Sequence, residues 1–276
     1  MNVSHGTDVT IAAGCSKRPS SKAAASEEGR RTLRYVEPLS DARTPLADFF
    51  SILLEYGSMP PSHADRSLSG LYVILDPSAC PDRSLTDVLK EAATAGARLF
   101  QYRNKSASMK EAYAEALLLR QVALDAGVTF IVNDRCDLAL AVNADGVHLG
   151  QGDVRLDLAR KVLGPNKLIG ISTHNPDQVR EAVAGNPDYL GFGPIFKPGS
   201  KQDHDPVVGL EGLRAIRRLT SLPVFAIGGI QIDQAGEVIR AGANGVAVIS
   251  AVLKAPDIRF AVKSFLAQMP RSTSPA

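Results

Sequence analysis

Two aspartates, Asp134 and Asp153, stand just beyond short apolar runs that begin near Thr129 and Asp145. If those runs are neighbouring parallel strands, both carboxylates lie at the same edge of the sheet. Two carboxylates, together with water and substrate oxygens, form the ligand set in which proteins usually hold Mg²⁺. The alternative is that Asp134 pairs with Arg135 and that Asp153 caps the next helix. Taken alone, the two residues leave both interpretations open.

Three basic side chains, Arg103, Lys105 and Lys201, follow two other apolar runs. Cations beside a divalent metal favour a highly anionic ligand such as a diphosphate, although solvated surface charges are the commoner role of Lys and Arg. Gly228-Gly229 and Ile249-Ser250 follow the last two runs. Backbone N–H groups at such glycines can approach a phosphate closely because no Cβ stands in the way. The pattern predicts two anion sites, and hence two phosphorylated substrates.

These side chains need a scaffold that brings many strand ends together, and the sequence supplies eight candidate strands. They recur about every 25 residues, which suits one strand and one helix per unit. Most are apolar on both faces, as buried parallel strands are. The strands are predicted to begin near Leu71, Arg98, Thr129, Asp145, Leu168, Asp188, Pro223 and Asn244. Helices are predicted over 85–95, 109–126, 178–184, 210–219 and 234–241.

Eight such units predict an α/β fold of the (β/α)₈ TIM-barrel class, with the site at the carboxyl ends of the strands. The competing fold is an open, doubly wound sheet. That fold is expected to carry G-x-G-x-x-G after its first strand, where this chain has Asp76-Pro77-Ser78. The barrel is therefore the favoured architecture. Its predicted extent is 71–268, between an extension over 1–70 and a tail over 269–276.

The extension over 1–70 differs in composition from the barrel. Residues 1–30 are rich in Ser and Ala without apolar periodicity, which is typical of disorder, and a targeting peptide is the alternative. Leu46, Phe49, Phe50, Leu53 and Leu54 form one apolar stripe, so an amphipathic helix is predicted near 45–56. That helix is expected to pack on the barrel, with an oligomer contact or a lid as the alternative. The extension is thus predicted to be partly disordered.

Composition excludes several classes of protein. The formal net charge of the 276 residues is only +2, which argues against a nucleic-acid binder that relies on bulk charge. No apolar stretch approaches the roughly 18 residues of a membrane span. The cysteines Cys15, Cys80 and Cys136 are far apart and form no C-x-x-C pair, which favours a reducing compartment, and a cytoplasmic location is expected. Partners are expected to be small molecules, with neither nucleic acid nor membrane, and a homo-oligomer is left open.

A set of motifs occurs in order along the predicted barrel: Gln101-x-Arg103-x-Lys105, Asn133-Asp134-Arg135, Asp145-Gly146-Val147-His148-Leu149-Gly150-Gln151-x-Asp153, Ile169-Gly170-Ile171-Ser172-x-His174, Gly191-x-Gly193-Pro194-Ile195-Phe196 and Ala226-Ile227-Gly228-Gly229-Ile230. As a set, they resemble the thiamine phosphate synthase family, within the thiazole tautomerase superfamily. The resemblance covers about 71–268 and does not extend over 1–70.

The resemblance implies an activity. The family joins 4-amino-2-methyl-5-(diphosphooxymethyl)pyrimidine to 4-methyl-5-(2-phosphooxyethyl)thiazole, or to its carboxylated form, and releases diphosphate in a dissociative, Mg²⁺-assisted substitution. It implies Asp134 and Asp153 as Mg²⁺ ligands, and Ser172, Lys201 and Arg103 as the catalytic set. The implied substrate-binding residues are Gln101 on the pyrimidine, Arg103, Lys105, Asn133, Ser172 and Lys201 on its diphosphate, and Ser200, Gly229, Ile249 and Ser250 toward the thiazole phosphate.

This chain departs from the family in two places. Tyr102 and Asn104 stand where the family usually has Leu and Glu, and strand alternation predicts that both point away from the site. After the sixth strand, Pro198 replaces a family Thr and cannot donate a hydrogen bond, while Lys197 adds a cation. The thiazole-phosphate contact expected at that point is therefore left open.

Two other functions compete with the synthase. A thiazole tautomerase-like barrel needs an acid/base pair, for which His174 is the candidate, although a histidine at a barrel mouth is more often a hydrogen-bonding scaffold. The tautomerase does not need the Arg103 and Lys105 cations or the two aspartates, and their joint presence weighs against it. The third function is a non-catalytic barrel that binds a phosphorylated ligand, and Pro198 favours it.

Overall fold

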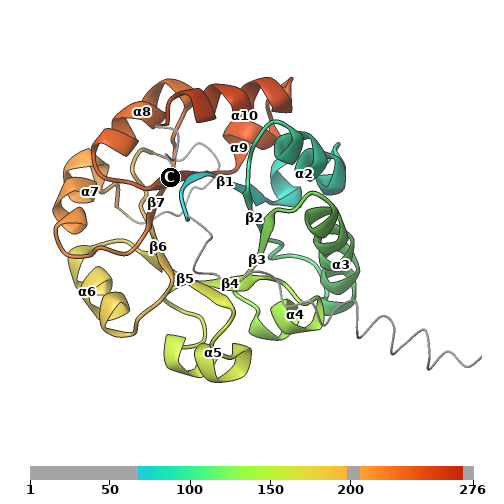
Figure 1. Ribbon diagram of the computed structural model, residues 1–276, viewed down its shortest axis with the longest axis horizontal. Coiled ribbons are helices and arrows are strands. Elements are labelled where there is room, and N and C mark those ends of the chain that lie inside the picture. The colour runs from blue at the N-terminus through green and yellow to red at the C-terminus, as the bar shows by residue number, and fades with distance from the viewer. Residues whose placement is uncertain (1–67, 198–205, 270–276) are drawn as a thin grey trace, which may run out of the picture. The chain divides into compact units, whose positions relative to one another are not determined.

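The computed structural model describes residues 68–197 and 206–269. Eight parallel strands form a closed barrel in chain order, in which β8 pairs with β1, and the helices lie outside the ring of strands (Figure 1). The TIM-barrel prediction is confirmed. The strands are β1 (Gly70–Leu75), β2 (Leu99–Tyr102), β3 (Thr129–Asn133), β4 (Gly146–Leu149), β5 (Leu168–Thr173), β6 (Tyr189–Phe192), β7 (Val224–Ile227) and β8 (Gly245–Val248).

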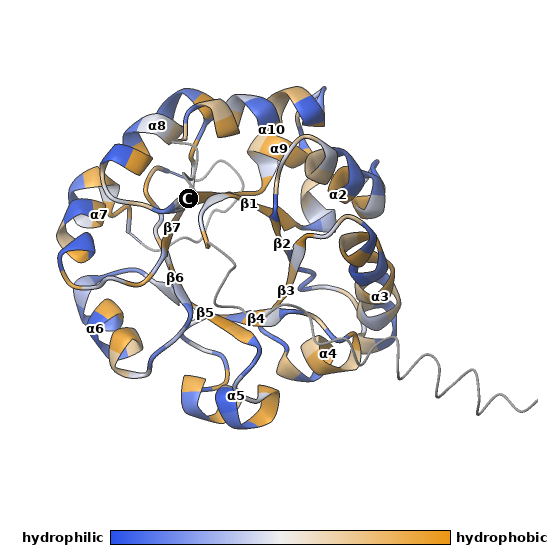
Figure 2. Ribbon diagram, in the orientation of Figure 1, coloured by the Kyte–Doolittle hydropathy of each residue, from blue (hydrophilic) through white to orange (hydrophobic). Residues whose placement is uncertain are grey.

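The helices connect successive strands. Each contains both hydrophobic and hydrophilic residues, as expected for an amphipathic helix that covers a barrel (Figure 2). The first connection also contains the 3-10 helix η2 (Pro77–Ala79). In the described residues, the α-helices are α2 (Leu85–Thr94), α3 (Met109–Asp125), α4 (Cys136–Ala141), α5 (Leu156–Leu163), α6 (Pro176–Ala184), α7 (Gly209–Arg217), α8 (Ile232–Arg240), α9 (Ser250–Leu253) and α10 (Ile258–Ala267). None of them is long and apolar enough to cross a membrane.

Every strand begins within one residue of its predicted start, and the five predicted helices are present with ends shifted by a few residues. The longest helix, α3, begins at a capping box in which Ser108 accepts from the backbone N–H of Glu111 and the Glu111 carboxylate accepts from the backbone of Ser108. Helices α4, α5, α9 and α10 are additional to these five. Of them, α4 and α9 have only six and four residues, too few turns to display a helical period. The helix predicted near 45–56 lies outside the described residues.

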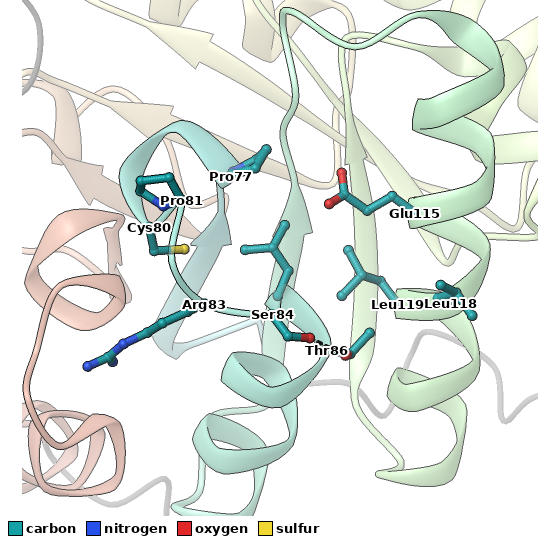
Figure 3. Close-up of a pocket in the computed structure, with 10 residues that line it drawn as sticks. Pro77, Cys80, Pro81, Arg83, Ser84, Thr86, Glu115, Leu118 and Leu119 are labelled. Atoms are coloured by element: carbon teal, nitrogen blue, oxygen red, sulfur yellow. Dashed lines mark hydrogen bonds between the residues drawn. The ribbon is translucent and has the colours of Figure 1, made fainter.

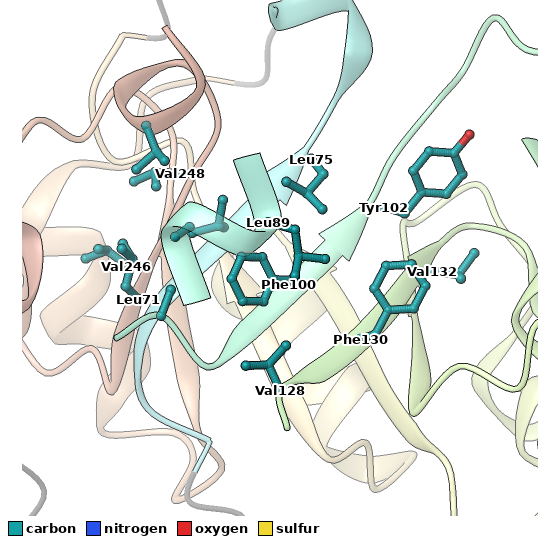
Figure 4. Close-up of a cluster of buried hydrophobic side chains, with 14 of the residues drawn as sticks. Leu71, Leu75, Leu89, Phe100, Tyr102, Val128, Phe130, Val132, Val246 and Val248 are labelled. Atoms are coloured by element: carbon teal, nitrogen blue, oxygen red, sulfur yellow. The ribbon is translucent and has the colours of Figure 1, made fainter. Parts of the chain in front are cut away.

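One layer of the core lies between the strands and the helices. Phe100, Tyr102, Phe130 and Val132 point outward from β2 and β3, and the side chains of β1, β8 and α2 pack beside them (Figure 4). Alternate residues of the same strands point into the barrel. Tyr102 therefore lies on the outer face, and its hydroxyl donates to Glu115 of α3 at 2.6 Å. The prediction that Tyr102 points away from the site is confirmed.

A second, smaller layer fills the barrel interior. Tyr72 of β1, Tyr189 of β6 and Phe225 of β7 meet edge to face, with ring centroids 5.2 Å apart for Tyr72 and Phe225 and 5.6 Å for Tyr189 and Phe225. Because β1 and β6 are not neighbours in the barrel, the contact between the two tyrosines crosses its interior. Such ring pairs contribute about 0.5–1.5 kcal/mol beyond the area that they bury. The interior is thus a packed core.

Gly170 of β5 makes room for this inner layer. A Cβ at Gly170 would lie 2.1 Å from the Tyr189 ring and 2.5 Å from Nδ1 of His148. We expect Gly170→Ala to lower the free energy of unfolding by about 2–3 kcal/mol, because overpacking forces rings and backbone apart. For a barrel of this size the melting temperature should fall by roughly 5–10 °C.

Thermal unfolding followed by circular dichroism measures this change. The matched control is Gly152→Ala, because a Cβ there meets nothing within 4 Å. The control should melt within a degree or two of the wild type, as neutral surface substitutions do. Equal melting temperatures for the two variants would show that Gly170 is not needed for space.

Candidate active site

The two predicted carboxylates meet at the carboxyl ends of β3 and β4. Asp134 directly follows β3, and its backbone N–H donates to the carbonyl of His148 on β4 at 2.8 Å. Asp153 lies in the loop after β4, where its carboxylate accepts from the backbone N–H of Gly150 at 2.6 Å. The two side chains are close enough to share a hydrogen bond. The loop after β4 therefore turns Asp153 back toward Asp134.

The carboxylate of Asp134 sits in an unfavourable electrostatic position. Burial, then the hydrogen bond and charge of Asp153, raise its pKa above the ordinary value, and Lys105 only partly opposes them. Asp134 also has a φ of 62°, a left-handed conformation that Asp and Asn tolerate better than most residues. Within the described residues, no group of three or more His, Cys, Asp or Glu could hold a metal. A cation at this place would have two protein carboxylates.

Arg103 lies at the end of β2 and forms an ion pair with Asp76 at the end of β1. The pair is largely buried, with side-chain exposures of 18% for Arg103 and 6% for Asp76. The other oxygen of Asp76 accepts from the backbone N–H and the hydroxyl of Ser78. Asp76 is thereby the N-cap of η2. Asp76 thus fixes the direction of the guanidinium. Arg103 is a positioned cation with donors left for an anion.

Lys105 reaches the carboxylate pair from the other side. Its ammonium lies 3.2 Å from Asp134, and its side chain is 61% exposed. Asn133 is the last residue of β3 and is half-buried beside them. Asn104, between the two cations, donates to Glu115 of α3 and so points away from the site, as predicted. The ends of β2, β3 and β4 therefore gather two cations, an amide and two carboxylates.

Gln101 and Ser172 are linked through the barrel interior. Gln101 donates from Nε2 to the hydroxyl of Tyr72 at 2.6 Å, and that hydroxyl lies 2.9 Å from the hydroxyl of Tyr189. His148 continues the chain, with Nδ1 at 3.1 Å from the Tyr189 hydroxyl and Nε2 at 2.9 Å from Oγ of Ser172. Burial lowers the pKa of His148 to about 4, so the ring is neutral near pH 7.

The residues predicted to bind a phosphate lie at the ends of β7 and β8. Gly229 has a φ of 67°, and a Cβ there would lie 2.7 Å from the carbonyl oxygen of Lys197, so only glycine fits beneath the loop after β6. Ile249 precedes the short helix α9, which begins at Ser250. Both are half-buried. Binding of a phosphate by this edge stays a prediction.

The loop after β6 is only partly described. Lys197 is exposed, whereas Pro198, Ser200 and Lys201 lie outside the described residues. At the end of β5, Nδ1 of His174 lies 2.7 Å from the carbonyl oxygen of Gly193, and the backbone N–H of His174 donates to Gln178. This contact ties the end of β5 to the end of β6. The contact fits the hydrogen-bonding scaffold role, and the choice between that role and an acid/base role stays open.

A separate cavity of about 280 Å³ lies between η2, the start of α2 and α3 (Figure 3). None of the predicted site residues lines it. Its wall includes Glu115, which holds Tyr102 and Asn104, and the thiol of Cys80, whose pKa burial raises. We therefore locate the candidate site by the convergence of charged and polar groups at the strand ends.

Sequence reasoning missed four of the residues that shape this site. Asp76 follows β1 as the other candidates follow their strands, so the rule that found them could have found it. Tyr72 and Tyr189 resemble ordinary strand residues, and nothing in their spacing marks them as a polar pair. His148 belongs to the motif from Asp145 to Asp153, but the sequence assigned it no role. Its place within an apolar strand was the available signal, because a buried imidazole needs hydrogen-bond partners.

Comparison with known proteins supports the family that the motifs indicated. The family model of thiamine monophosphate synthase matches residues 71–252. A thiamine-phosphate synthase of Chloroflexus aurantiacus is 49% identical over 197 residues, which are 71% of this chain and 91% of that relative. A thiamine-phosphate synthase of Moorella thermoacetica is 46% identical over 193 residues, or 70% and 92%.

A solved structure agrees with these relatives. The thiamine phosphate pyrophosphorylase of Pyrococcus furiosus superposes with a TM-score of 0.66 at 40% identity, covering 73% of this chain and 96% of that one. The family model spans more than half of this chain, and each relative is covered almost completely. This chain therefore belongs to the thiamine monophosphate synthase family of enzymes.

Proposed function

We propose that this enzyme joins 4-amino-2-methyl-5-(diphosphooxymethyl)pyrimidine to 4-methyl-5-(2-phosphooxyethyl)thiazole, or its carboxylated form, giving thiamine phosphate and diphosphate. The observation that carries the proposal is the meeting of Arg103 and Lys105 with the Asp134 and Asp153 carboxylates at one end of the barrel. Opposed charges at one edge suit a diphosphate held through a cation and through basic side chains. Membership of the family supports the same reaction.

The residues fit Mg²⁺. Asp134 and Asp153 would hold it, since both are hard oxygen ligands and their mutual repulsion is relieved by a cation. When bound, Mg²⁺ supplies positive charge to the oxygens of the diphosphate. A hydrated magnesium ion needs only one or two protein carboxylates. The pair found here is therefore sufficient.

The chain's own residues would act by binding and orientation. Arg103, held by Asp76, and Lys105 would neutralise the diphosphate as its bond to the pyrimidine methylene breaks. Lys201 would add a further positive charge, and Asn133 and Ser172 would donate hydrogen bonds to the diphosphate oxygens. The thiazole nitrogen then donates its electron pair to the methylene carbon and forms the new C–N bond, with the thiazole held close by its phosphate. Gly229, Ile249, Ser250 and Ser200 would bind that phosphate.

This reaction needs no protein nucleophile. Cys136, the nearest thiol in sequence, lies at the start of α4, and burial raises its pKa, which weakens it as a nucleophile. His174 is engaged with Gly193, which argues against the tautomerase that would need it as an acid or base. We also propose a cytoplasmic location, which the free thiols of Cys80 and Cys136 support.

An assay of the purified full chain tests the proposal. With both substrates and Mg²⁺, diphosphate and thiamine phosphate should form in equal amounts, and chelation of the metal should stop both. Isomerisation of the thiazole without diphosphate release would favour the tautomerase. Ligand binding without any turnover would favour the non-catalytic barrel, and either outcome would overturn the synthase proposal.

A further inference from the structure

A continuous chain of four hydrogen bonds crosses the barrel interior and joins two of the proposed substrate-binding residues. It runs from Gln101 through Tyr72, Tyr189 and His148 to Ser172, with successive distances of 2.6, 2.9, 3.1 and 2.9 Å. The three central side chains are at most 8% exposed. Water therefore cannot easily supply an alternative partner, and each group depends on the next.

The hydrogen-bond chain has a donor-to-acceptor direction, which follows from the Gln101 end. The Tyr72 oxygen accepts from Nε2 of Gln101, so its single proton is free to point at the oxygen of Tyr189. The proton of Tyr189 then points at Nδ1 of His148. A neutral imidazole carries one proton, which must stand on Nε2 and be donated to Oγ of Ser172. In this arrangement each of the three central side chains accepts one hydrogen bond and donates one.

The direction determines what each end offers to a ligand. Gln101 joins the hydrogen-bond chain through Nε2, so its carboxamide oxygen takes no part in that chain. That oxygen is a pure acceptor. The oxygen of Ser172 is already accepting from His148, so its own proton is available to donate. If the chain ran the other way, Gln101 would offer N–H groups and Ser172 would offer a lone pair.

We propose that Tyr72, Tyr189 and His148 are positioning residues that set substrate specificity by fixing this direction. They keep an acceptor at Gln101 and a donor at Ser172. The ligand that fits has N–H at one end and an anionic oxygen at the other. The inference rests on the proposed function, because the pyrimidine substrate carries an amine on its ring and a diphosphate on its methylene. A lone pair facing that diphosphate would oppose binding.

The packing around Tyr189 and His148 supports this hydrogen-bond chain. A Cβ at Gly170 would strike both Tyr189 and His148, and a Cβ at Gly191 would lie 3.1 Å from the His148 ring. The two glycines thus leave just the space that the tyrosine and the imidazole fill. Tight packing restricts the rings to the orientation in which the hydrogen bonds form. The chain is therefore held by shape as well as by hydrogen bonding.

The tautomer of His148 is the direct test. The full-length protein is labelled with ¹⁵N-histidine and studied by NMR without substrate. Its five histidines are distinguished by comparison with His148→Asn. We expect a proton on Nε2 and none on Nδ1 of His148. A proton on Nδ1 would mean the opposite direction and would overturn the proposal. The measurement needs no turnover, so its result is independent of whether the protein proves to be a synthase.

Interrupting the hydrogen-bond chain at Tyr189 tests how that chain affects substrate binding. Tyr189→Phe removes only the hydroxyl, so the Nδ1 signal of His148 should shift. The KM for the pyrimidine diphosphate should rise about tenfold, as expected for losing a hydrogen bond of about 1.4 kcal/mol. The KM for the thiazole phosphate should change less than about twofold. Equal changes in both KM values would indicate a general structural effect and would contradict the proposal.

Tyr102→Phe is the matched control. Tyr102 is as buried as Tyr189, but its hydroxyl donates to Glu115 on the outer face of the barrel. The control should alter neither the His148 signal nor either KM. A shift of the pyrimidine KM in the control as large as in Tyr189→Phe would count against a directional chain. If Tyr189→Phe does not fold, Tyr72→Phe interrupts the same chain one residue earlier and should give the same selective change.

Discussion

Asp134→Asn should reduce turnover by about a thousandfold or more, because it removes one of the two carboxylates proposed to hold Mg²⁺ beside the leaving diphosphate. Asn keeps the shape of the side chain and also tolerates the φ of 62° at this position. Ala would add roughly 1–2 kcal/mol of backbone strain. Asn is therefore the cleaner substitution, and its effect reports on the charge.

The fold should not suffer from this change. A raised carboxyl pKa means that the ionised form of Asp134 is less favourable in the folded chain than in the unfolded one, so its charge lowers stability at neutral pH. Replacing it by an amide should leave the melting temperature without metal equal to that of the wild type or slightly higher. A residue that lowers stability yet supports activity is typical of a functional site.

Steady-state release of diphosphate and calorimetric titration with Mg²⁺ measure the two effects. The matched control is Asp137→Asn, three residues further on, where the carboxylate pairs with Arg135 and is 59% exposed. The control should retain normal turnover and normal Mg²⁺ affinity, since exposed pairs contribute little. Wild-type turnover in Asp134→Asn would remove Asp134 from the metal site.

The strands and the edge of the site were predictable because both follow from repeated local signals. Buried parallel strands are apolar on both faces, and eight such runs, such as those at Leu71 and Leu168, stand out against polar helical surfaces. The carboxyl ends of those strands must meet, so Asn133 and Ser172 could be placed at one edge without knowing any distance. Local pattern and topology were sufficient there.

The interior could not be predicted in the same way. Tyr72 and Tyr189 are 117 residues apart, and only barrel closure brings their hydroxyls together. Asp145 is the first residue of the motif that ends at Asp153. Its carboxylate lies at the start of β4, away from the site, where it pairs with Arg120 and accepts from the backbone N–H of Phe130. The motif therefore combines residues of the site with a buried ion pair that supports the barrel. Sequence alone does not separate these two roles.

The second large effect is expected at Arg103, where activity and stability are linked through Asp76. Arg103→Gln should lower kcat/KM by about a hundredfold to a thousandfold, because a fixed cation facing the diphosphate is lost. It also leaves the Asp76 carboxylate, with a side chain only 6% exposed, without its cation. Removing one partner of a buried pair costs roughly 3–5 kcal/mol. The melting temperature should therefore fall as well, and low activity alone would be ambiguous.

A double variant separates the two effects. Asp76→Asn combined with Arg103→Gln removes both charges, while an Asn oxygen can still accept from the backbone of Ser78 and cap η2. No uncompensated charge then remains buried, so the melting temperature should largely recover. The loss of kcat/KM should remain, because no cation faces the diphosphate. Arg155→Gln, at an exposed ion pair with Asp157, is the control and should change neither quantity. Recovery of activity together with stability in the double variant would mean that Arg103 holds up the fold and does not act on the substrate.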